Sequence, residues 1–189
     1  MRNTEVVTGK VRFSYLNVFT PRAGQDGGDP KYSVQLLIPK SDTATLGKIN
    51  AAMKAAADAF RAKKGVASLP ATPMTPLHDG DGTKPNSGEP YGPECKGCYV
   101  MSVSCSADQR PGVYDAFRQD ILNPAEIKSG DYGRAHINFY GYSNKRKGIG
   151  AGLLAVQKLS DGDPLGGAVA SASAFDDGFS DGDSDAFLL

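Results

Sequence analysis

Aromatic and cationic side chains alternate along one segment, residues 132–143 (YGRAHINFYGYS). In an extended strand, successive side chains point to opposite faces, so the even positions of this segment share one face. That face carries Tyr132, Arg134, His136, Asn138, Tyr140 and Tyr142. Flat rings offer surfaces on which unpaired bases stack, and nearby cations attract the phosphates. The segment therefore predicts a surface for single-stranded nucleic acid, in which His136 is expected to make only local hydrogen bonds.

Further basic residues extend this surface. The turn that follows the segment contains Lys145, Arg146 and Lys147. On strands expected to lie beside it, a basic track is formed by Lys10, Arg12 and Lys31. We predict that these cations, with the aromatic–basic strand, form one DNA-binding face. The alternative is an ordinary strand, because a row of tyrosines often packs beneath a loop.

The charge of the chain is divided unevenly between its two parts. All 21 Lys and Arg precede residue 160, together with 14 of the 21 Asp and Glu, so that part has a formal charge of +7. The remainder carries −7, which hides the asymmetry in a net charge of zero. A basic body with an acidic tail is typical of proteins that bind polyanions. A solvated basic surface with a solubilising tail is the alternative.

The last residues combine acidic and apolar side chains, namely Asp181, Asp183, Asp185, Phe187, Leu188 and Leu189. The carboxylates can occupy a basic groove as a weak competitor of DNA. The apolar tip can insert into a pocket on a replication or recombination protein, whose basic rim meets the carboxylates. A tail that serves only solubility has no use for an apolar tip, so we favour partner docking.

Residues for other chemistry are sparse. Cys95 and Cys98 form a C-x-x-C pair, but a structural zinc site usually needs two such pairs. The segment from Tyr99 alternates as a strand, unlike the helix that follows a redox pair. No Ser/His/Asp or Cys/His arrangement stands out. We predict a protein without catalytic residues, metal or cofactor, with a zinc-binding structural protein as the alternative.

Two features bear on the compartment. Three cysteines in a chain of this size indicate reduced thiols in a cytoplasm. No apolar run approaches the roughly 20 residues of a membrane span, and the first residues lack the apolar stretch of a secretory signal. We expect no membrane association and a cytoplasmic location, in the host cell if the chain is phage-encoded. The sequence leaves a homo-oligomer open.

Short strands dominate the expected fold. Alternating side chains predict strands over residues 6–19, 31–38, 99–106, 132–143 and 149–159. In the first strand, Val7, Val11, Phe13 and Tyr15 are expected to point inward, and Thr8, Lys10, Arg12 and Ser14 outward. Ser41 or Asp42 caps a helix that runs to about Lys64, with an apolar stripe from Leu46 to Phe60. Residues 20–30 and 66–97 are expected to be loops.

These elements predict a mainly β fold with one or two helices, arranged as an OB-fold-like barrel over residues 1–167. The composition of residues 168–189 is dominated by Gly, Asp, Ser and Ala. A segment of this composition buries too little apolar surface to offset its ordering entropy, so we expect a disordered acidic tail.

Several groups of residues resemble a known family. They are 32–40 (YSVQLLIPK), 97–100 (GCYV), 138–140 with 147–149, and 156–158 through 161–167 (DGDPLGG). Over about residues 5–167 the chain is similar to a family of phage single-stranded DNA-binding proteins formerly called DUF2815. The resemblance implies an OB-fold, no enzymatic activity and protection of single strands during phage replication or recombination. The acidic tail resembles those of bacterial and phage single-strand binders that recruit replication proteins.

From these patterns we predict sequence-tolerant binding of single-stranded DNA, with a tail that regulates access and recruits partners. A recombination mediator that anneals complementary strands is the alternative within the same class.

Overall fold

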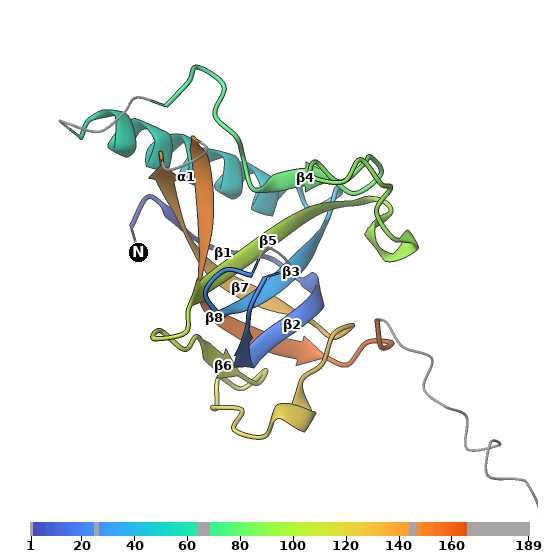
Figure 1. Cartoon of the computed structure of the whole chain (residues 1–189). Helices are drawn as coiled ribbons and strands as arrows, with labels where there is room; N and C mark the ends of the chain where they lie inside the picture. The colour runs from blue at the N-terminus through green and yellow to red at the C-terminus, as the bar shows by residue number, and fades with distance from the viewer. Residues whose placement is uncertain (1, 25–26, 64–68, 144–146, 166–189) are drawn as a thin grey trace, which may run out of the picture.

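The computed structural model describes residues 2–24, 27–63, 69–143 and 147–165 (Figure 1). Its elements, in chain order, are β1 (Glu5–Val7), β2 (Val11–Arg22), β3 (Lys31–Pro39), α1 (Thr43–Arg61), β4 (Leu77–Asp79), the 3-10 turn η1 (Pro93–Cys95), β5 (Cys98–Ser106), β6 (Gly112–Tyr114), the 3-10 turn η2 (Pro124–Glu126), β7 (Tyr132–Tyr142) and β8 (Gly148–Ser160).

Five strands close into a ring. β2 pairs with β3, β3 with β5, β5 with β8, β8 with β7, and β7 again with β2. The β5–β8 contact is parallel, whereas the other four are antiparallel. The short strands β1, β6 and β4 add to β7, β8 and β5 at the margins. This closed Greek-key ring confirms the predicted OB-like barrel.

The barrel interior is filled by the inward side chains of the alternating strands. Its fully buried large residues include Phe13, Leu36, Ile38, Met101, Ile137 and Phe139. Leu37 and Val100 point to the outer face and pack with Cys95 in a second, smaller cluster. The excursion over residues 69–97 therefore covers part of the barrel wall. It is held there by Lys40, whose ammonium lies 2.6 Å from Asp79 and 2.7 Å from Asp81.

The single long helix α1 lies across one end of the barrel, at the top of Figure 1. Its start is capped as predicted, because the Asp42 carboxylate accepts a hydrogen bond of 3.0 Å from the Thr45 amide. The predicted apolar stripe is buried from Ile49 to Phe60. Phe60 packs on the backbone of Gly141, where a Cβ would come within 2.5 Å of the Phe60 side chain. The helix thereby fixes the far end of β7.

The prediction of one strand over residues 6–19 is wrong, because the chain breaks between β1 and β2. Thr8, expected outside, is fully buried, and its hydroxyl accepts a hydrogen bond of 3.0 Å from the Ala135 amide. Tyr15, expected inside, is 70% exposed, since the β2–β3 register shifts between Ser14 and Asn17. This bulge inserts one extra residue and turns Tyr15 outward. β2 also continues to Arg22, inside the region expected to be a loop.

Candidate nucleic-acid interface

A groove runs over the outer face of β2, β3 and β5. Its first part is lined by Tyr15, Asn17 and Arg22 from β2, by Ala23, Gly24, Gly28 and Asp29 from the following loop, by Lys31 from β3 and by Ser104 from β5. The second part shares Asp29, Lys31 and Ser104 with it and ends against Tyr140 of β7. We call these two parts together the groove. It lies on the second and third strands of the ring beside the first loop, where OB-folds bind oligonucleotides.

Two aromatic rings stand at the groove with open surface. The exposed fractions of Tyr15 and Tyr140 are 70% and 48%, and they are the most exposed tyrosines of the described chain. Tyr15 adopts a φ of 47°, a left-handed conformation that non-glycine residues rarely take. Such strain persists only where the surroundings impose it, and it is often found at binding sites. The backbone strain therefore marks Tyr15 as a functional candidate.

The turn at residues 128–131 imposes this conformation. On one side of the bulge, the Phe13 amide donates a hydrogen bond of 2.9 Å to the Asp131 carbonyl. The Phe13 carbonyl in turn accepts a hydrogen bond of 2.8 Å from the Gly130 amide. On the other side, the Leu16 amide donates to the Ser129 hydroxyl at 3.0 Å. Tyr15 is thus held between two anchored neighbours.

Tyr140 rests on glycine. It pairs with Gly150 across the β7–β8 ladder, and a Cβ on Gly150 would lie 2.7 Å from the ring. Tyr142 pairs with Gly148 in the same way, its hydroxyl 3.0 Å from where a Cβ would stand. Burial, and secondly the neighbouring Tyr142, raise the pKa of Tyr140 above its usual value. The phenol therefore stays neutral at physiological pH and does not repel phosphates.

The cations of the groove lie opposite one another. Arg22 of β2 is the register partner of Lys31 of β3, and both side chains are exposed. Within the described residues, neither lies within ion-pair distance of a carboxylate, although Asp29 also lines the groove. Like charges directly opposite on neighbouring strands are destabilising on their own. An anion between them would relieve this repulsion, which favours a phosphate contact.

Three other predicted residues form a cluster elsewhere. Lys10 and Arg12 lie 5.0 and 5.5 Å from the centre of the Tyr132 ring. The Arg12 guanidinium also donates to the carbonyls of Gly130, at 3.1 Å, and Asp163, at 2.8 Å. Tyr132 is eight residues from Tyr140 along β7, or about 26 Å at the rise of a strand. Tyr132 therefore lies far from Tyr140, whereas Arg12 is three residues from Tyr15 on β2 and bonds the turn that holds Tyr15. The contact of this cluster with DNA stays a prediction.

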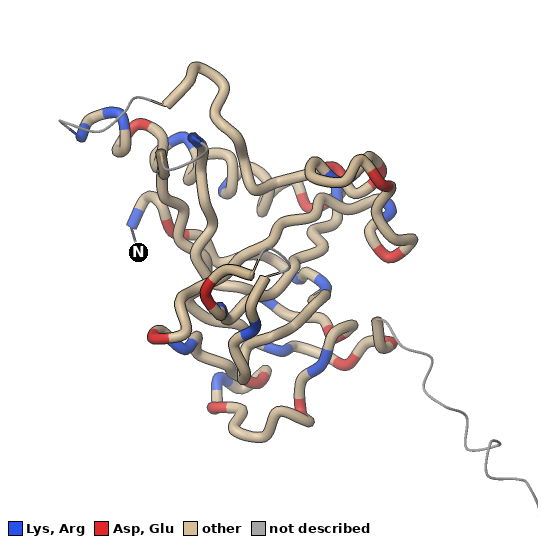
Figure 2. The backbone as a smooth tube through the Cα atoms, in the orientation of Figure 1, with Lys and Arg blue, Asp and Glu red and all other residues tan. Residues whose placement is uncertain are grey.

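The remaining predicted residues of β7 have partners within the fold. The Arg134 Nε donates to the Thr8 carbonyl at 2.9 Å, and the Asn138 side chain accepts a 2.8 Å hydrogen bond from the Thr4 hydroxyl. Lys147 is exposed at the start of β8. Lys145, Arg146 and the tail residues 181–189 lie outside the described residues. Figure 2 shows Lys and Arg on several sides of the body, interleaved with Asp and Glu, so charge alone does not mark the site.

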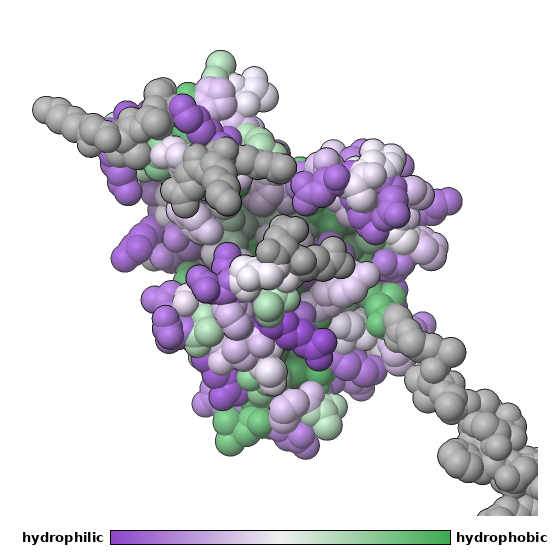
Figure 3. Space-filling view, in the orientation of Figure 1, coloured by the Kyte–Doolittle hydropathy of each residue, from purple (hydrophilic) through white to green (hydrophobic). Residues whose placement is uncertain are grey.

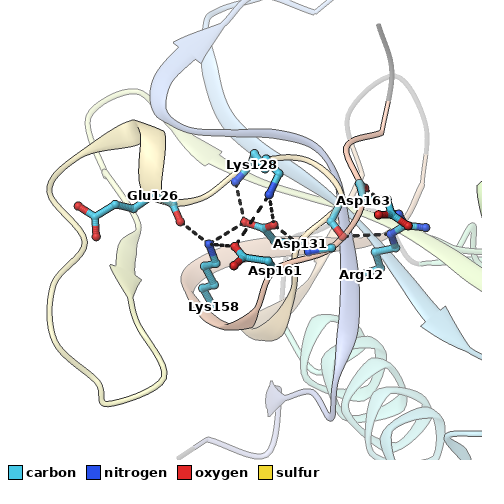
Figure 4. Close-up of polar contacts among 9 residues, drawn as sticks. Arg12, Glu126, Lys128, Asp131, Lys158, Asp161 and Asp163 are labelled. Atoms are coloured by element: carbon cyan, nitrogen blue, oxygen red, sulfur yellow. Dashed lines mark hydrogen bonds and ion pairs between the residues drawn. The ribbon is translucent and has the colours of Figure 1, made fainter. Parts of the chain in front are cut away.

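A buried carboxylate anchors the chain after β8 (Figure 4). Asp131 is fully buried, and its oxygens lie 2.8 Å from Lys128 and 3.1 Å from Lys158. These bonds hold the pKa of Asp131 below its usual value despite burial. The Asp131 carboxylate also accepts a hydrogen bond of 3.2 Å from the Gly162 amide. Because Leu165 and Tyr15 line the same small hollow, the tail leaves the body beside one end of the groove.

The cysteines offer no reactive centre. Burial raises the pKa of Cys95 to about 11 and that of Cys98 above its usual value, so both thiols stay protonated at physiological pH. Across the described segments, no group of three or more His, Cys, Asp or Glu is placed to hold a metal ion. No helix among those residues is both long and apolar enough to span a bilayer.

Tyr15, Asn17 and Arg22 are the groove residues that the sequence prediction missed. The apolar positions of β2 change from odd to even numbers, from Val11 and Phe13 to Leu16 and Val18. That change of phase is the signature of a bulge and could have placed Tyr15 on the outside.

Comparison with known proteins identifies the family. The profile of the family described as Enterobacter phage Enc34, ssDNA-binding protein, matches residues 4–187. The chain belongs to this family. The match confirms the resemblance seen in the sequence and extends it into the acidic tail.

Relatives of the Enc34 family are known from other phages and from solved structures. A putative protein, p50, of Acyrthosiphon pisum secondary endosymbiont phage 1 is 31% identical, covering 92% of this chain and 93% of its own. The single-stranded DNA-binding protein from bacteriophage Enc34, solved in complex with ssDNA, is 32% identical, with a TM-score of 0.72 over 87% of this chain and 91% of its own. The bacteriophage T7 single-stranded DNA-binding protein gives a TM-score of 0.55 at 14% identity, covering 98% of both chains, which shows a shared fold only.

Proposed function

We propose that this chain binds single-stranded DNA in the groove, without regard to base sequence. The observation that carries the proposal is the placement of two exposed rings, Tyr15 and Tyr140, in one groove with the facing cations Arg22 and Lys31. The Enc34 relative solved with ssDNA supports the choice of ligand.

Each part of the groove has a distinct task in this proposal. The rings provide stacking surfaces for two bases, and stacking tolerates any base because every base has a π face. Arg22 and Lys31 neutralise phosphates and release counterions. Ser104 and Asn17 offer polar atoms along the floor. A duplex keeps its bases stacked on each other, so only a single strand can use the rings.

The groove extends naturally toward the loop between β7 and β8. Tyr142 and Lys147 flank that loop, next to Tyr140, and the predicted cations Lys145 and Arg146 belong to it. We include these four residues in the proposed interface. Lys10, Arg12, Tyr132, Arg134 and Asn138 are proposed as outer contacts for a longer strand that follows β7.

The acidic tail is proposed to compete with DNA for the groove and to recruit replication or recombination proteins. The exit of the chain at Leu165, in the same hollow as Tyr15, supports the competition. The five Asp residues beyond Leu165, with no Lys or Arg, supply the charge. Deletion of residues 168–189 should therefore raise DNA affinity at low salt and matter less at high salt. Equal affinities of the two proteins at low salt would contradict the competition.

The test of the main proposal is a comparison of single-stranded and duplex oligonucleotides of the same sequence across a range of salt concentrations. We expect much tighter binding of the single strand at every salt concentration, because stacking survives salt screening. A Tyr140→Ala variant should lose most of this preference. Equal affinity for the two ligands would overturn the proposal.

A further inference from the structure

A second pocket lies on the body away from the groove. It is formed by outward positions of β7 and β8 together with Val7 of β1 and Tyr114 of β6. The side chains of Val7, Tyr114 and Ala155 give it an apolar lining. None of its lining residues borders the groove. It is therefore a separate site, with a surface suited to apolar side chains.

Two guanidinium groups border this pocket. Arg134 is oriented by the hydrogen bond of 2.9 Å from its Nε to the Thr8 carbonyl. Arg118 sits at the tip of a tight turn with a φ of 68°. That turn is rigid, because the Asp115 carboxylate accepts from the amides of Phe117 and Gln119 at 2.8 Å each. The Arg134 side chain is thus oriented by a hydrogen bond, and Arg118 projects from a turn whose backbone is fixed.

Neither arginine has an acidic partner in the described part of the chain. Two acidic groups on neighbouring segments are engaged elsewhere: the Asp115 carboxylate accepts the hydrogen bonds of the Phe117 and Gln119 amides, and Glu5 lies 3.5 Å from the Nε2 of His136 and 3.8 Å from Arg2. An apolar pocket beside two unpaired cations selects a ligand that carries apolar side chains next to carboxylates. A nucleotide base has no apolar side chain to fill the pocket, and its one phosphate would pair with only one of the two arginines.

The chain itself contains a segment with this chemistry. Residues 181–189 (DGDSDAFLL) place three Asp residues before Phe187, Leu188 and Leu189. Fifteen residues lie between Leu165 and Asp181, and the 16 steps from one to the other reach about 50 Å when extended. The body is only about 40 Å across at the compactness expected of its length. The segment can therefore reach the pocket of its own molecule.

We propose that Phe187 and Leu188 dock in this pocket of the same chain, with Asp183 and Asp185 facing Arg118 and Arg134. The inference goes beyond the proposed function and does not depend on DNA binding in the groove. In the docked state the apolar tip is hidden from partner proteins, while the root of the tail stays beside Tyr15. Phe117, which is 81% exposed and precedes Arg118, would be partly covered as well. Green atoms mark such apolar surface on the loops at the lower end of Figure 3.

The test uses the full chain with a photoreactive phenylalanine analogue at position 187. Illumination without DNA should crosslink position 187 to Val7, Tyr114 or Ala155. When isotopically light and heavy proteins are mixed, each crosslinked pair of peptides should be entirely light or entirely heavy, because both peptides come from the same molecule. Arg118→Glu should lower the yield at least about fivefold, because a partly exposed attraction becomes a repulsion. Lys63→Glu, an exposed charge reversal beyond α1, is the matched control and should leave the yield unchanged.

Several results would overturn this proposal. Crosslinks to Tyr15, Lys31 or Tyr140 would place the tip in the groove, and crosslinks between light and heavy peptides would place it on a second molecule. Absence of crosslinks to the body would exclude docking. DNA affinity of the same variants separates the two proposals: if position 187 does not crosslink to the pocket and Arg118→Glu weakens DNA binding, the pocket serves DNA and not the tail.

Discussion

Replacement of Tyr15 by glycine should change stability and DNA affinity in opposite directions. Tyr15 is 70% exposed, so its ring contributes little to the core. Its φ of 47° is costly for tyrosine but free for glycine. The variant therefore removes the proposed stacking surface and relieves backbone strain at the same time.

The two effects can be estimated separately. A left-handed conformation costs a non-glycine residue roughly 1–2 kcal/mol. Glycine loses about 0.4–1 kcal/mol through the extra freedom of the unfolded chain. Tyr15→Gly should therefore change the free energy of unfolding by an amount between zero and a gain of about 1.6 kcal/mol. Loss of one stacked base should cost ~1–3 kcal/mol of binding free energy, or about 5- to 150-fold in Kd.

Thermal unfolding and fluorescence anisotropy with a labelled single strand measure the two quantities. Tyr15→Phe should bind like the unaltered protein, because it keeps the ring. Phe117→Ala is a control for loss of an exposed ring outside the groove, since Phe117 is 81% exposed. It should leave DNA affinity unchanged. If Tyr15→Gly binds as tightly as Phe117→Ala, or unfolds at a lower temperature than the unaltered protein, the reasoning from strain to function is refuted.

Three further changes test other parts of the site. Arg22→Ala and Lys31→Ala should each reduce the slope of log affinity against log salt by about 0.7, the value for one phosphate contact on a single strand; an unchanged slope would remove that cation from the interface. Gly150→Val should push the Tyr140 ring from its place and weaken DNA binding by ~1–3 kcal/mol in the same titration, because a Cβ there lies 2.7 Å from the ring. Asp131→Asn should lower the free energy of unfolding by about 1.5–3 kcal/mol near neutral pH in urea titrations. Because the folded-state pKa of Asp131 is lowered, its contribution is present above about pH 4 and lost as pH falls through the folded pKa, so the two proteins should converge in acid.

Local patterns along the chain sufficed for much of the fold. Alternation placed β3, β5 and β7, and the capping residue Asp42 placed the start of α1. Closure of the barrel depends on pairings between distant strands, such as β2 with β7, which no local pattern reveals. The number and order of the elements predicted an OB-like barrel, and the family resemblance implied the same fold, but neither gave the register of these pairings.

The site was harder to predict because its residues come together only through the barrel. Tyr140 and Lys31 were chosen from separate strands, and the structure brings both to the groove. Tyr132 was chosen by the same rule, yet it lies about 26 Å from Tyr140 along β7 and contacts Arg12 instead. Alternation identifies a face of a strand, but it does not show which end of that face meets a groove. Arg22 was missed because Pro21 before it and Gly24 after it suggested that a loop had already begun.

The turn at residues 128–131 connects the two proposed activities physically. The Ser129 hydroxyl in this turn accepts a hydrogen bond from the Leu16 amide and thereby helps to hold the strained Tyr15. The Ser129 carbonyl accepts a hydrogen bond from the Leu165 amide, at the root of the tail. The Asp131 carboxylate holds the turn in place through Lys128 and Lys158. A change in this turn would therefore act on the stacking ring and on the exit of the tail together. Asp131→Asn should consequently weaken DNA binding through Tyr15 although Asp131 lies outside the groove, whereas removal of the tail alone should strengthen it.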